Sequence, residues 1–254
     1  LSLSDAWTTT LGARVTDFQT KSHNKTPAMP TNWGEGAHAE QEITPYGAVM
    51  YDVLPNTSLY ASYSEIFMPQ TAQTYDGQTL DPRTGEQYEL GVKAGFFDRK
   101  LDTTFALFRT HELNRAFADP DHPDYYLPLG KIQVQGYEAE VTGSPMSGLQ
   151  LSAGFTRLMT KYLKDKNNQG RQVSYWYPPN QLKVWAMYRP GGAWADWRFG
   201  AGMVGQGPVR VNGTGATDIR EQGSFAVYDA TVGYRINARL DLTFAVKNLF
   251  DRKY

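Results

Sequence analysis

The chain of 254 residues contains no cysteine and no run of eighteen apolar residues. Without cysteine, disulfide bonds, cysteine-ligated zinc and thiol catalysis are excluded. The missing apolar run excludes a transmembrane helix, but it leaves open a membrane barrel, whose strands need only about 9 to 11 alternating residues. The net charge is −1, and no clustered basic segment indicates nucleic acid as a partner.

Alternation of polar and apolar residues with a period of two runs through the whole chain. In TSLYASYSEIF, residues 57–67, Leu59, Ala61 and Tyr63 share one face of an extended chain, and serines occupy the other. The same pattern predicts an all-β chain of about eleven strands, each with one apolar face. The predicted strands are 4–19, 42–54, 57–67, 85–97, 100–114, 130–143, 149–162, 181–190, 197–207, 223–235 and 239–250.

The links between these strands alternate in length. Short turns are predicted at 55–56, 98–99, 143–148, 190–196 and 237–238, and long polar links at 20–41, 68–84, 115–129, 163–180 and 208–222. In an up-and-down antiparallel sheet this places every short turn at one end, which is typical of outer-membrane barrels. A soluble sandwich has Greek-key links, and a propeller requires a blade repeat, which the chain lacks.

A barrel in lipid predicts that the apolar face is outward and the polar face lines the lumen. Aromatic residues near strand ends are then expected in the interfacial girdles: Trp7, Tyr46, Tyr51, Tyr188, Trp197 and Tyr234. Charged residues on the polar face are expected to pair with one another or with a plug, or to form a hydrated wall: Glu89, Lys93, Asp102, Glu138, Glu140, Asp229, Asp241 and Lys247.

Two motifs resemble nucleotide-binding or metal-binding sequences, but their context favours a structural role. GAGMVG has the glycine spacing of a dinucleotide fingerprint at Gly200, Gly202 and Gly205, but no helix is predicted after it to bind a phosphate, so crowding on a lumen-facing strand explains it better. ADPDHPDYY gathers three aspartates and a histidine in a long link without an EF-hand pattern. We therefore predict no metal bound by protein side chains and no enzymatic activity.

The long links are rich in aromatic and amide side chains, which offer contact area with little rotamer entropy to lose. They predict a surface for a bulky, polar ligand. The candidate ligand-binding residues are Tyr75, Arg115, Tyr125, Tyr126, Tyr175 and Trp176.

Four segments, taken in order, resemble the barrel of TonB-dependent siderophore receptors, of the hydroxamate and pyoverdine type. They are SLYASYSEIFMPQ, LDPRTGEQYELGVKAGFFDRKLDTTFALFR, GKIQVQGYEAEVTGSPMSGLQLSAGFT and YDATVGYRINARLDLTFAVKNLFDRKY. Pro82 to Lys93 and Asn248 to Tyr254 carry the most specific motifs. Pro178-Pro179-Asn180 departs from the Pro-Arg-His of many relatives.

The resemblance implies a 22-stranded barrel filled by an N-terminal plug, with residues 1–254 forming its C-terminal part at about strands 11 to 21. The plug and the last strand are then outside the sequence. It also implies transport of a ferric siderophore across a Gram-negative outer membrane. The implied partners are the TonB–ExbB–ExbD complex, acting through the N-terminal region, and outer-membrane lipid with lipopolysaccharide.

Three other functions remain open at this point. The same architecture takes up non-iron nutrients such as a cobalamin or an oligosaccharide. An adhesin or autotransporter barrel would bind a host partner through its loops. A secreted β enzyme would be soluble without detergent, so the solubility of the intact protein separates it from the barrels.

Overall fold

The computed structural model describes residues 4–23, 25, 32–119, 121–165, 169–173, 177–212 and 219–253. They form one antiparallel sheet of eleven strands, in the order β1-β2-β3-β4-β5-β6-β7-β8-β9-β12-β13, and a separate hairpin of β10 and β11. The strands are β1 Trp7–Ser22, β2 Gly34–Leu54, β3 Thr57–Met68, β4 Arg83–Phe96, β5 Leu101–Ala118, β6 Tyr126–Gly143, β7 Leu149–Lys164, β8 Asn180–Tyr188, β9 Trp197–Gln206, β10 Val209–Asn212, β11 Ile219–Gln222, β12 Phe225–Asn237 and β13 Leu240–Val246.

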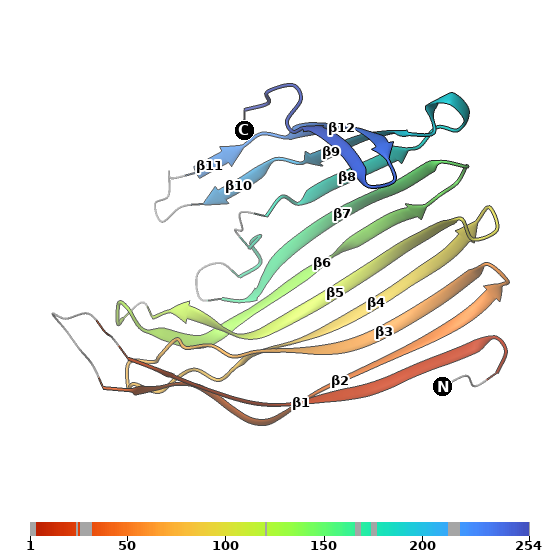
Figure 1. The fold of residues 1–254 in the computed structure, drawn as a ribbon. Helices are drawn as coiled ribbons and strands as arrows, with labels where there is room; N and C mark the ends of the chain where they lie inside the picture. The colour runs from red at the N-terminus through yellow and green to blue at the C-terminus, as the bar shows by residue number, and fades with distance from the viewer. Residues whose placement is uncertain are drawn as a thin grey trace.

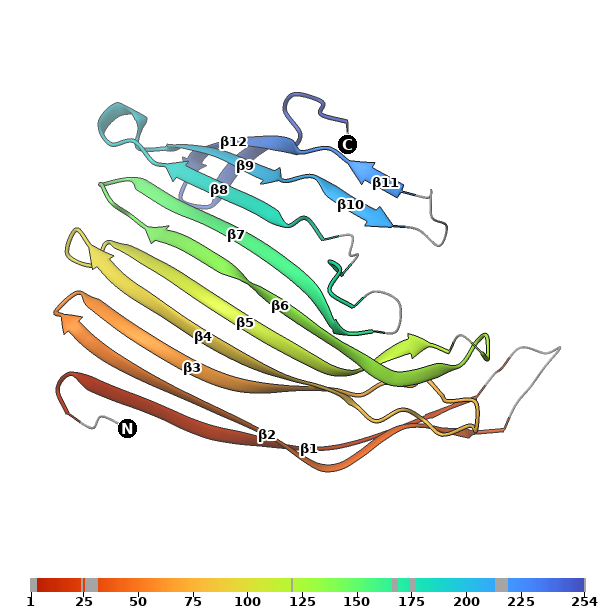
Figure 2. The same ribbon diagram turned by 180° about the vertical axis from the view of Figure 1, so that it is seen from behind.

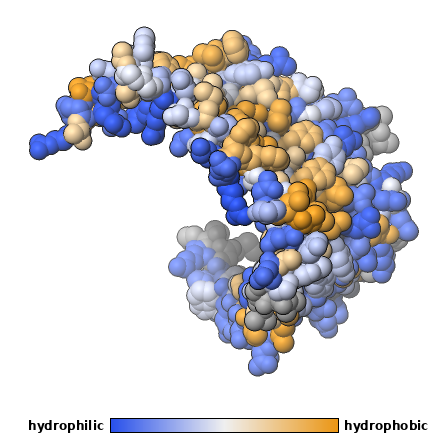
Figure 3. Space-filling view, turned by 90° about the vertical axis from the view of Figure 1, so that its right-hand side faces the viewer, coloured by the Kyte–Doolittle hydropathy of each residue, from blue (hydrophilic) through white to orange (hydrophobic). Residues whose placement is uncertain are grey.

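The eleven-stranded sheet is an up-and-down meander (Figure 1). Each strand pairs with its neighbours along the chain, except that β9 pairs with β12 across the hairpin β10–β11. The short turns gather at one end and the longer links at the other, as both ribbon views show (Figure 2). The sheet is curved, and the space-filling view has the outline of an arc that is open on one side (Figure 3). Helical structure in the described segments is limited to one short 3-10 turn, Gly192–Trp194, so no helix there could cross a bilayer.

Each of the eleven predicted strands corresponds to a strand of the sheet, but several predicted ends are wrong. β2 begins at Gly34 rather than residue 42, and β5 and β6 extend through most of the predicted link 115–129. The predicted link 208–222 contains the hairpin β10–β11. The extension of β2, residues 34–41, has only Ala37 and Ala39 as apolar side chains, and backbone pairing continues there without the strong alternation that marked the other strands.

The two faces of the sheet differ in polarity in the central parts of β3, β4 and β5. Cross-strand pairs align Leu59 with Val92, Val92 with Phe105, and Leu90 with Leu107, all on one face. The opposite face aligns Ser62 with Glu89. Residue exposure identifies the concave side: Ala106 on the polar face is 5% exposed, whereas the adjacent Leu107 is 48% exposed. The polar face therefore lines the hollow and the apolar face is outward.

Five of the six predicted girdle residues lie outward, close to the short-turn end. Trp7 packs against Tyr51 with ring centroids 4.5 Å apart, and Trp197 packs against Tyr234 at 4.7 Å; Tyr188 pairs with Phe199 on the same face. The prediction that Tyr46 belongs to the girdle is wrong. It pairs with Ser64 on the concave face and lies in the middle of β2, because that strand begins eight residues earlier than the alternation indicated.

Large aromatic residues on the concave face lie across glycines of the neighbouring strand. A β-carbon on Gly12 would collide with the Tyr46 ring, one on Gly91 would meet Tyr60 at 2.5 Å, and one on Gly202 would collide with Trp185. Strand glycines are used where another group approaches the backbone closely. This contact confirms the crowded-strand interpretation of GAGMVG, since a strand and not a phosphate-binding helix contains Gly202.

Candidate ligand-binding site

The concave face ends in a cluster of polar side chains at the long-link end of β3, β4 and β5. We call Gln70, Arg83, Glu112, Asn114 and Arg115 the mouth cluster. A β-bulge interrupts the pairing of β5 with β6 after Glu112, and Asn114 within it has a φ of 57°. Asparagine tolerates this left-handed conformation better than most residues, and such bulges redirect side chains. Arg115 consequently lies on the same side as Glu112, three residues earlier.

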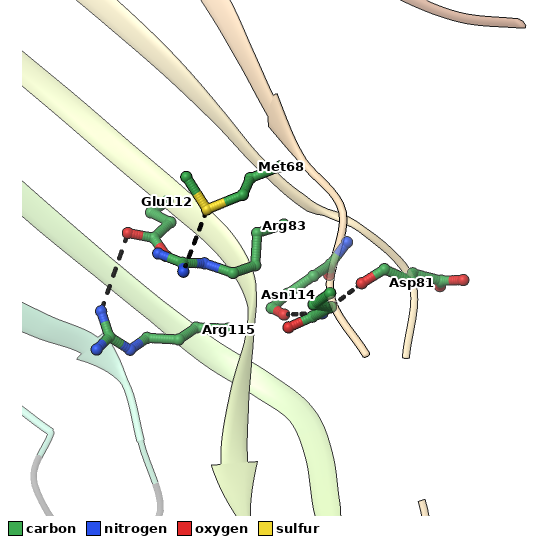
Figure 4. A network of polar contacts seen from close by, with 7 residues as sticks. Met68, Asp81, Arg83, Glu112, Asn114 and Arg115 are labelled. Atoms are coloured by element: carbon green, nitrogen blue, oxygen red, sulfur yellow. Dashed lines mark hydrogen bonds and ion pairs between the residues drawn. The ribbon is translucent and has the colours of Figure 1, made fainter. Parts of the chain in front are cut away.

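Glu112 joins two guanidinium groups in the mouth cluster (Figure 4). Arg83 donates its Nε–H to Glu112 Oε1 at 2.5 Å, and Arg115 Nη1 lies 4.0 Å from Glu112 Oε2. The Glu112 side chain is 14% exposed, and those of Arg83 and Arg115 are 30% and 31% exposed. Two cations share one carboxylate, so these three side chains present a net positive charge to the solvent at the mouth.

The link between β3 and β4 is anchored onto the bulge. Gln70 donates its side-chain N–H to the Asn114 carbonyl at 2.8 Å and also to the Asp81 carbonyl. Asn114 donates its own amide to the Pro82 carbonyl at 3.2 Å. Figure 4 shows the contacts at Asn114 and Asp81 beside the contact between Glu112 and Arg115. The two ends of the link are thereby held against β5, which fixes the wall of the mouth.

A cavity of about 460 Å³ opens beside the mouth cluster. Two of its charged or aromatic lining residues, Arg115 and Tyr126, are predicted binding residues. A second cavity of about 250 Å³ is lined by Gln172, Val173, Tyr177 and Pro179 on one side and by β5, β6 and β7 on the other, and Val173 there is 2% exposed. The first cavity is lined by Phe18, Ala37, Pro69, Gln70, Thr71, Ala72, Arg83, Arg115, Ala116 and Tyr126.

Two further predicted residues form a separate aromatic stack in the links. The Tyr75 ring stacks on His122 with centroids 3.7 Å apart and meets the edge of Tyr125 at 5.4 Å. Asp119 fixes the histidine, with 3.0 Å between Oδ2 and His122 Nδ1. The Asp121 backbone N–H and His122 hold the pKa of Asp119 below its usual range. The predicted Tyr175 and Trp176 lie outside the described residues.

Sequence reasoning missed Arg83, Glu112 and Phe18 as parts of the site. Arg83 lies in the stretch that carried the family resemblance, and Glu112 lies two residues before Asn114 in HELNR, residues 111–115. The available signal in the sequence was the charged Glu112 followed by Asn114, since asparagine tolerates the left-handed backbone conformation of a bulge. No group of three or more acidic, histidine or cysteine side chains in the described ranges is arranged to hold a metal ion.

Three of the predicted wall charges, farther from the mouth on the concave face, contact a tyrosine or an arginine outside the predicted set. Glu89 accepts a hydrogen bond from the Tyr60 hydroxyl at 2.6 Å, and Lys93 Nζ lies 5.0 Å from the centre of that ring. Asp241 pairs with Arg198 at 3.0 Å. In the part of the chain that the structure describes, no two of the eight predicted wall charges form an ion pair with each other. Pairing with a plug stays a prediction.

An antiparallel meander with an apolar convex face and a polar concave face is the wall of an outer-membrane β-barrel. The chain belongs to the family described as TonB dependent receptor-like, beta-barrel, whose model matches residues 1–249. It is therefore a protein of the bacterial outer membrane.

Known relatives include receptors for ferric pyoverdines. The chain is 37% identical to the ferric-pyoverdine M114 receptor of Pseudomonas sp. (strain M114) over 100% of its own length and 32% of the receptor. It is 33% identical to the ferripyoverdine receptor of Pseudomonas aeruginosa, over 96% of the chain and 30% of that receptor. The chain thus spans about a third of the length of these relatives.

Solved structures agree with the fold. The ferripyoverdine receptor of the Pseudomonas aeruginosa outer membrane, crystallised with ferripyoverdine, superposes with a TM-score of 0.80 at 29% identity, over 98% of this chain and 33% of that one. The alcaligin outer-membrane receptor of Bordetella pertussis superposes with a TM-score of 0.76 at 27% identity, over 98% and 41%.

Proposed function

We propose that residues 1–254 are the C-terminal part of the barrel wall of a TonB-dependent receptor that binds and imports a ferric siderophore. The observation that carries the proposal is the similarity of the whole chain to ferric-pyoverdine receptors. The mouth cavity of about 460 Å³ lined by Arg83, Arg115 and Tyr126 supports it. The chelate class that we propose is a pyoverdine or another hydroxamate-containing siderophore.

The chemistry of the mouth cluster suits such a ligand. A siderophore already supplies the iron ligands, so the receptor needs a shaped polar surface and no metal-binding side chains of its own. Arg83 and Arg115 provide ten N–H donors in two planar forks, and Glu112 holds the forks side by side. Arginine forks recognise carboxylate and other anionic oxygen groups well, and such groups are exposed at the edge of a ferric chelate.

The rest of the transport cycle is proposed from the family. A plug from the N-terminal region would fill the hollow against the concave face, and the TonB–ExbB–ExbD complex would act on that region to release the ligand into the periplasm. Outer-membrane lipid, including lipopolysaccharide, would surround the convex face. The protein performs no chemistry on the ligand in this scheme.

The test is a binding titration with the full-length receptor that contains this chain. Tryptophan fluorescence is followed against ferric pyoverdines, other ferric hydroxamates, ferric catecholates and mixed chelates, each compared with its iron-free form. Saturable quenching that requires iron and favours one class is expected. Quenching by none of the chelates, in a receptor with an intact β spectrum, would overturn the proposal in favour of a non-iron nutrient.

A paired variant links the binding to the mouth cluster. Arg83→Gln with Arg115→Gln removes both forks while keeping a hydrogen-bonding side chain at each position. Hydrogen bonds to charged groups contribute about 1.5–3 kcal/mol each, so affinity for an anionic chelate should fall by at least about tenfold. Arg189→Gln, in the exposed turn after β8, is the matched control and should leave the affinity unchanged.

A further inference from the structure

A methionine lies against an arginine of the mouth cluster. Met68, the last residue of β3, pairs across the sheet with Arg83, the first residue of β4. Met68 follows Ser62 by six residues, an even number, so its side chain is on the concave face. Arg83 donates its Nη1–H to Met68 Sδ at 3.6 Å (Figure 4). The register of β3 and β4 therefore brings this sulfur to a guanidinium at the mouth.

The contact with sulfur is weaker than the contact of Arg83 with Glu112. The Arg83 Nε–H donates to Glu112 Oε1 at 2.5 Å, and Nη2 contacts the same carboxylate. Those bonds are charge-assisted, whereas a thioether sulfur is a weak acceptor. Arg83 lines the mouth cavity and Met68 does not. A ligand oxygen in that cavity can therefore take Nη1 from the sulfur with little loss of bonding, while Glu112 keeps the rest of the guanidinium in place.

Met68 is open to solvent, as attack by a small oxidant requires. Among the methionines that the structure describes, Met68 and Met146 are more than half exposed, at 53% and 57%. Met146 is in the short turn between β6 and β7, at the opposite end of the sheet. Met159 is 43% exposed on the convex face, which meets lipid in a membrane. An oxidant dissolved in water therefore reaches Met68 and Met146 more readily than the other described methionines.

Oxidation changes the strength of this acceptor. The Met68 sulfur attacks one oxygen of hydrogen peroxide, so that an S–O bond forms, the O–O bond breaks, and the second oxygen leaves as water with both protons. Sulfur is oxidised by two electrons and the peroxide is reduced by two. The sulfoxide is a polar group, and its oxygen carries negative charge. It therefore accepts a hydrogen bond from a guanidinium more strongly than the thioether does.

We propose that Met68 is an oxidation-sensitive site that controls ligand binding, because its sulfoxide captures Arg83 Nη1 and withdraws that group from the mouth cavity. Glu112 then holds one edge of the guanidinium and the sulfoxide holds the other. An anionic ferric chelate loses one of the two arginine forks, so its affinity falls by about fivefold to tenfold. The inference rests on the proposed function, in which Arg83 binds the ligand.

The sulfoxide also ties the two ends of one link together. Met68 and Arg83 are the residues immediately before and after the link 69–82, so a stronger bond between them closes its base. Amide exchange in 69–82 should therefore slow when Met68 is oxidised. Oxidation that only disturbs packing would speed this exchange. The exchange measurement needs no siderophore, so it tests the contact independently of the proposed function.

The experiment uses the full-length receptor that contains this chain, treated in detergent with hydrogen peroxide until peptide mass spectrometry shows the sulfoxide at Met68. Affinity for the chelate selected by the fluorescence titration is measured before and after treatment. It should fall by about fivefold to tenfold, and methionine sulfoxide reductases A and B should restore it. Met68→Leu should have the same affinity before and after peroxide. Met146→Leu is the matched control and should lose affinity as the unmodified receptor does.

Amide exchange in 69–82 is followed in the same samples, and Arg83→Gln should abolish its slowing. A sulfoxide at Met68 with unchanged affinity would overturn the inference, as would an equal loss of affinity in Met68→Leu. Met68 that stays reduced while Met146 is oxidised would overturn it too. Absence of binding by the untreated receptor is instead a failure of the proposed function. Exchange in 69–82, slowed or not, then decides whether the sulfoxide holds Arg83.

Discussion

The orientation of the sheet predicts that replacing Leu90 with arginine destabilises the protein in a bilayer. Leu90 is 58% exposed, so the protein itself buries little of it. It lies six residues from Phe96, the end of β4 at the short turn, about 20 Å along the strand and close to the middle of the apolar band. Arginine at the midplane of a barrel's lipid face costs about 2–4 kcal/mol.

The assay is urea unfolding of the full-length receptor, folded into phosphatidylcholine vesicles and followed by tryptophan fluorescence. Ser62→Arg is the matched control: it introduces the same side chain one strand away on the concave face, directly opposite Glu89. It should change the free energy of unfolding by less than about 1 kcal/mol, because an arginine there stays in a polar setting and an exposed ion pair with Glu89 contributes about 0–1 kcal/mol. An effect of Leu90→Arg within about 0.5 kcal/mol, as at a water-exposed site, would refute the orientation.

Three further predictions concern single contacts. Gly202→Val collides with the Trp185 ring and should lower the free energy of unfolding by about 1–3 kcal/mol in the same urea assay; an unchanged midpoint contradicts the packing. Glu112→Ala leaves two guanidiniums without their shared carboxylate and should speed amide exchange in 69–82 without moving the global midpoint; unaltered exchange there would count against the ion pairs. Asp119, with its lowered pKa, stabilises the His122 contact above about pH 4, and this stabilisation is lost as pH falls further. Exchange in 121–125, corrected for intrinsic rates, should therefore rise between pH 5 and 3, and constant protection would show that the contact does not order the link.

The strand order was predictable because lipid outside and water inside impose alternation on each spanning strand. The convex face was predictable from alternating apolar residues such as Leu59, Ala61 and Tyr63. The short turns between successive strands predicted the up-and-down order. The strand extensions beyond the membrane were not predictable in the same way. Residues 34–41 offer only the small side chains of Ala37 and Ala39 as an apolar signal, although both are buried. Because β2 begins at Gly34, Tyr46 lies in the middle of the strand and not at its end.

The site was only partly predictable for a related reason. Tyr126 and Arg115 were chosen as members of an aromatic, polar set of links, and the structure brings both to one cavity. Arg83 reaches that cavity through its place at the start of β4. The bulge at Asn114 brings Arg115 to the side of the sheet on which Glu112 pairs with both arginines. A bulge shifts every following side chain by one position, and its place cannot be read from alternation alone.

The central claim is that this chain forms part of a ferric-siderophore importer, and iron uptake tests it most directly. Cells that lack other siderophore receptors and produce the full-length receptor are given iron-55 bound to the chelate selected by fluorescence, with and without a functional TonB protein. We predict accumulation that requires both the receptor and TonB and that falls with Arg83→Gln and Arg115→Gln together. Equal accumulation in cells with and without the receptor would contradict the account.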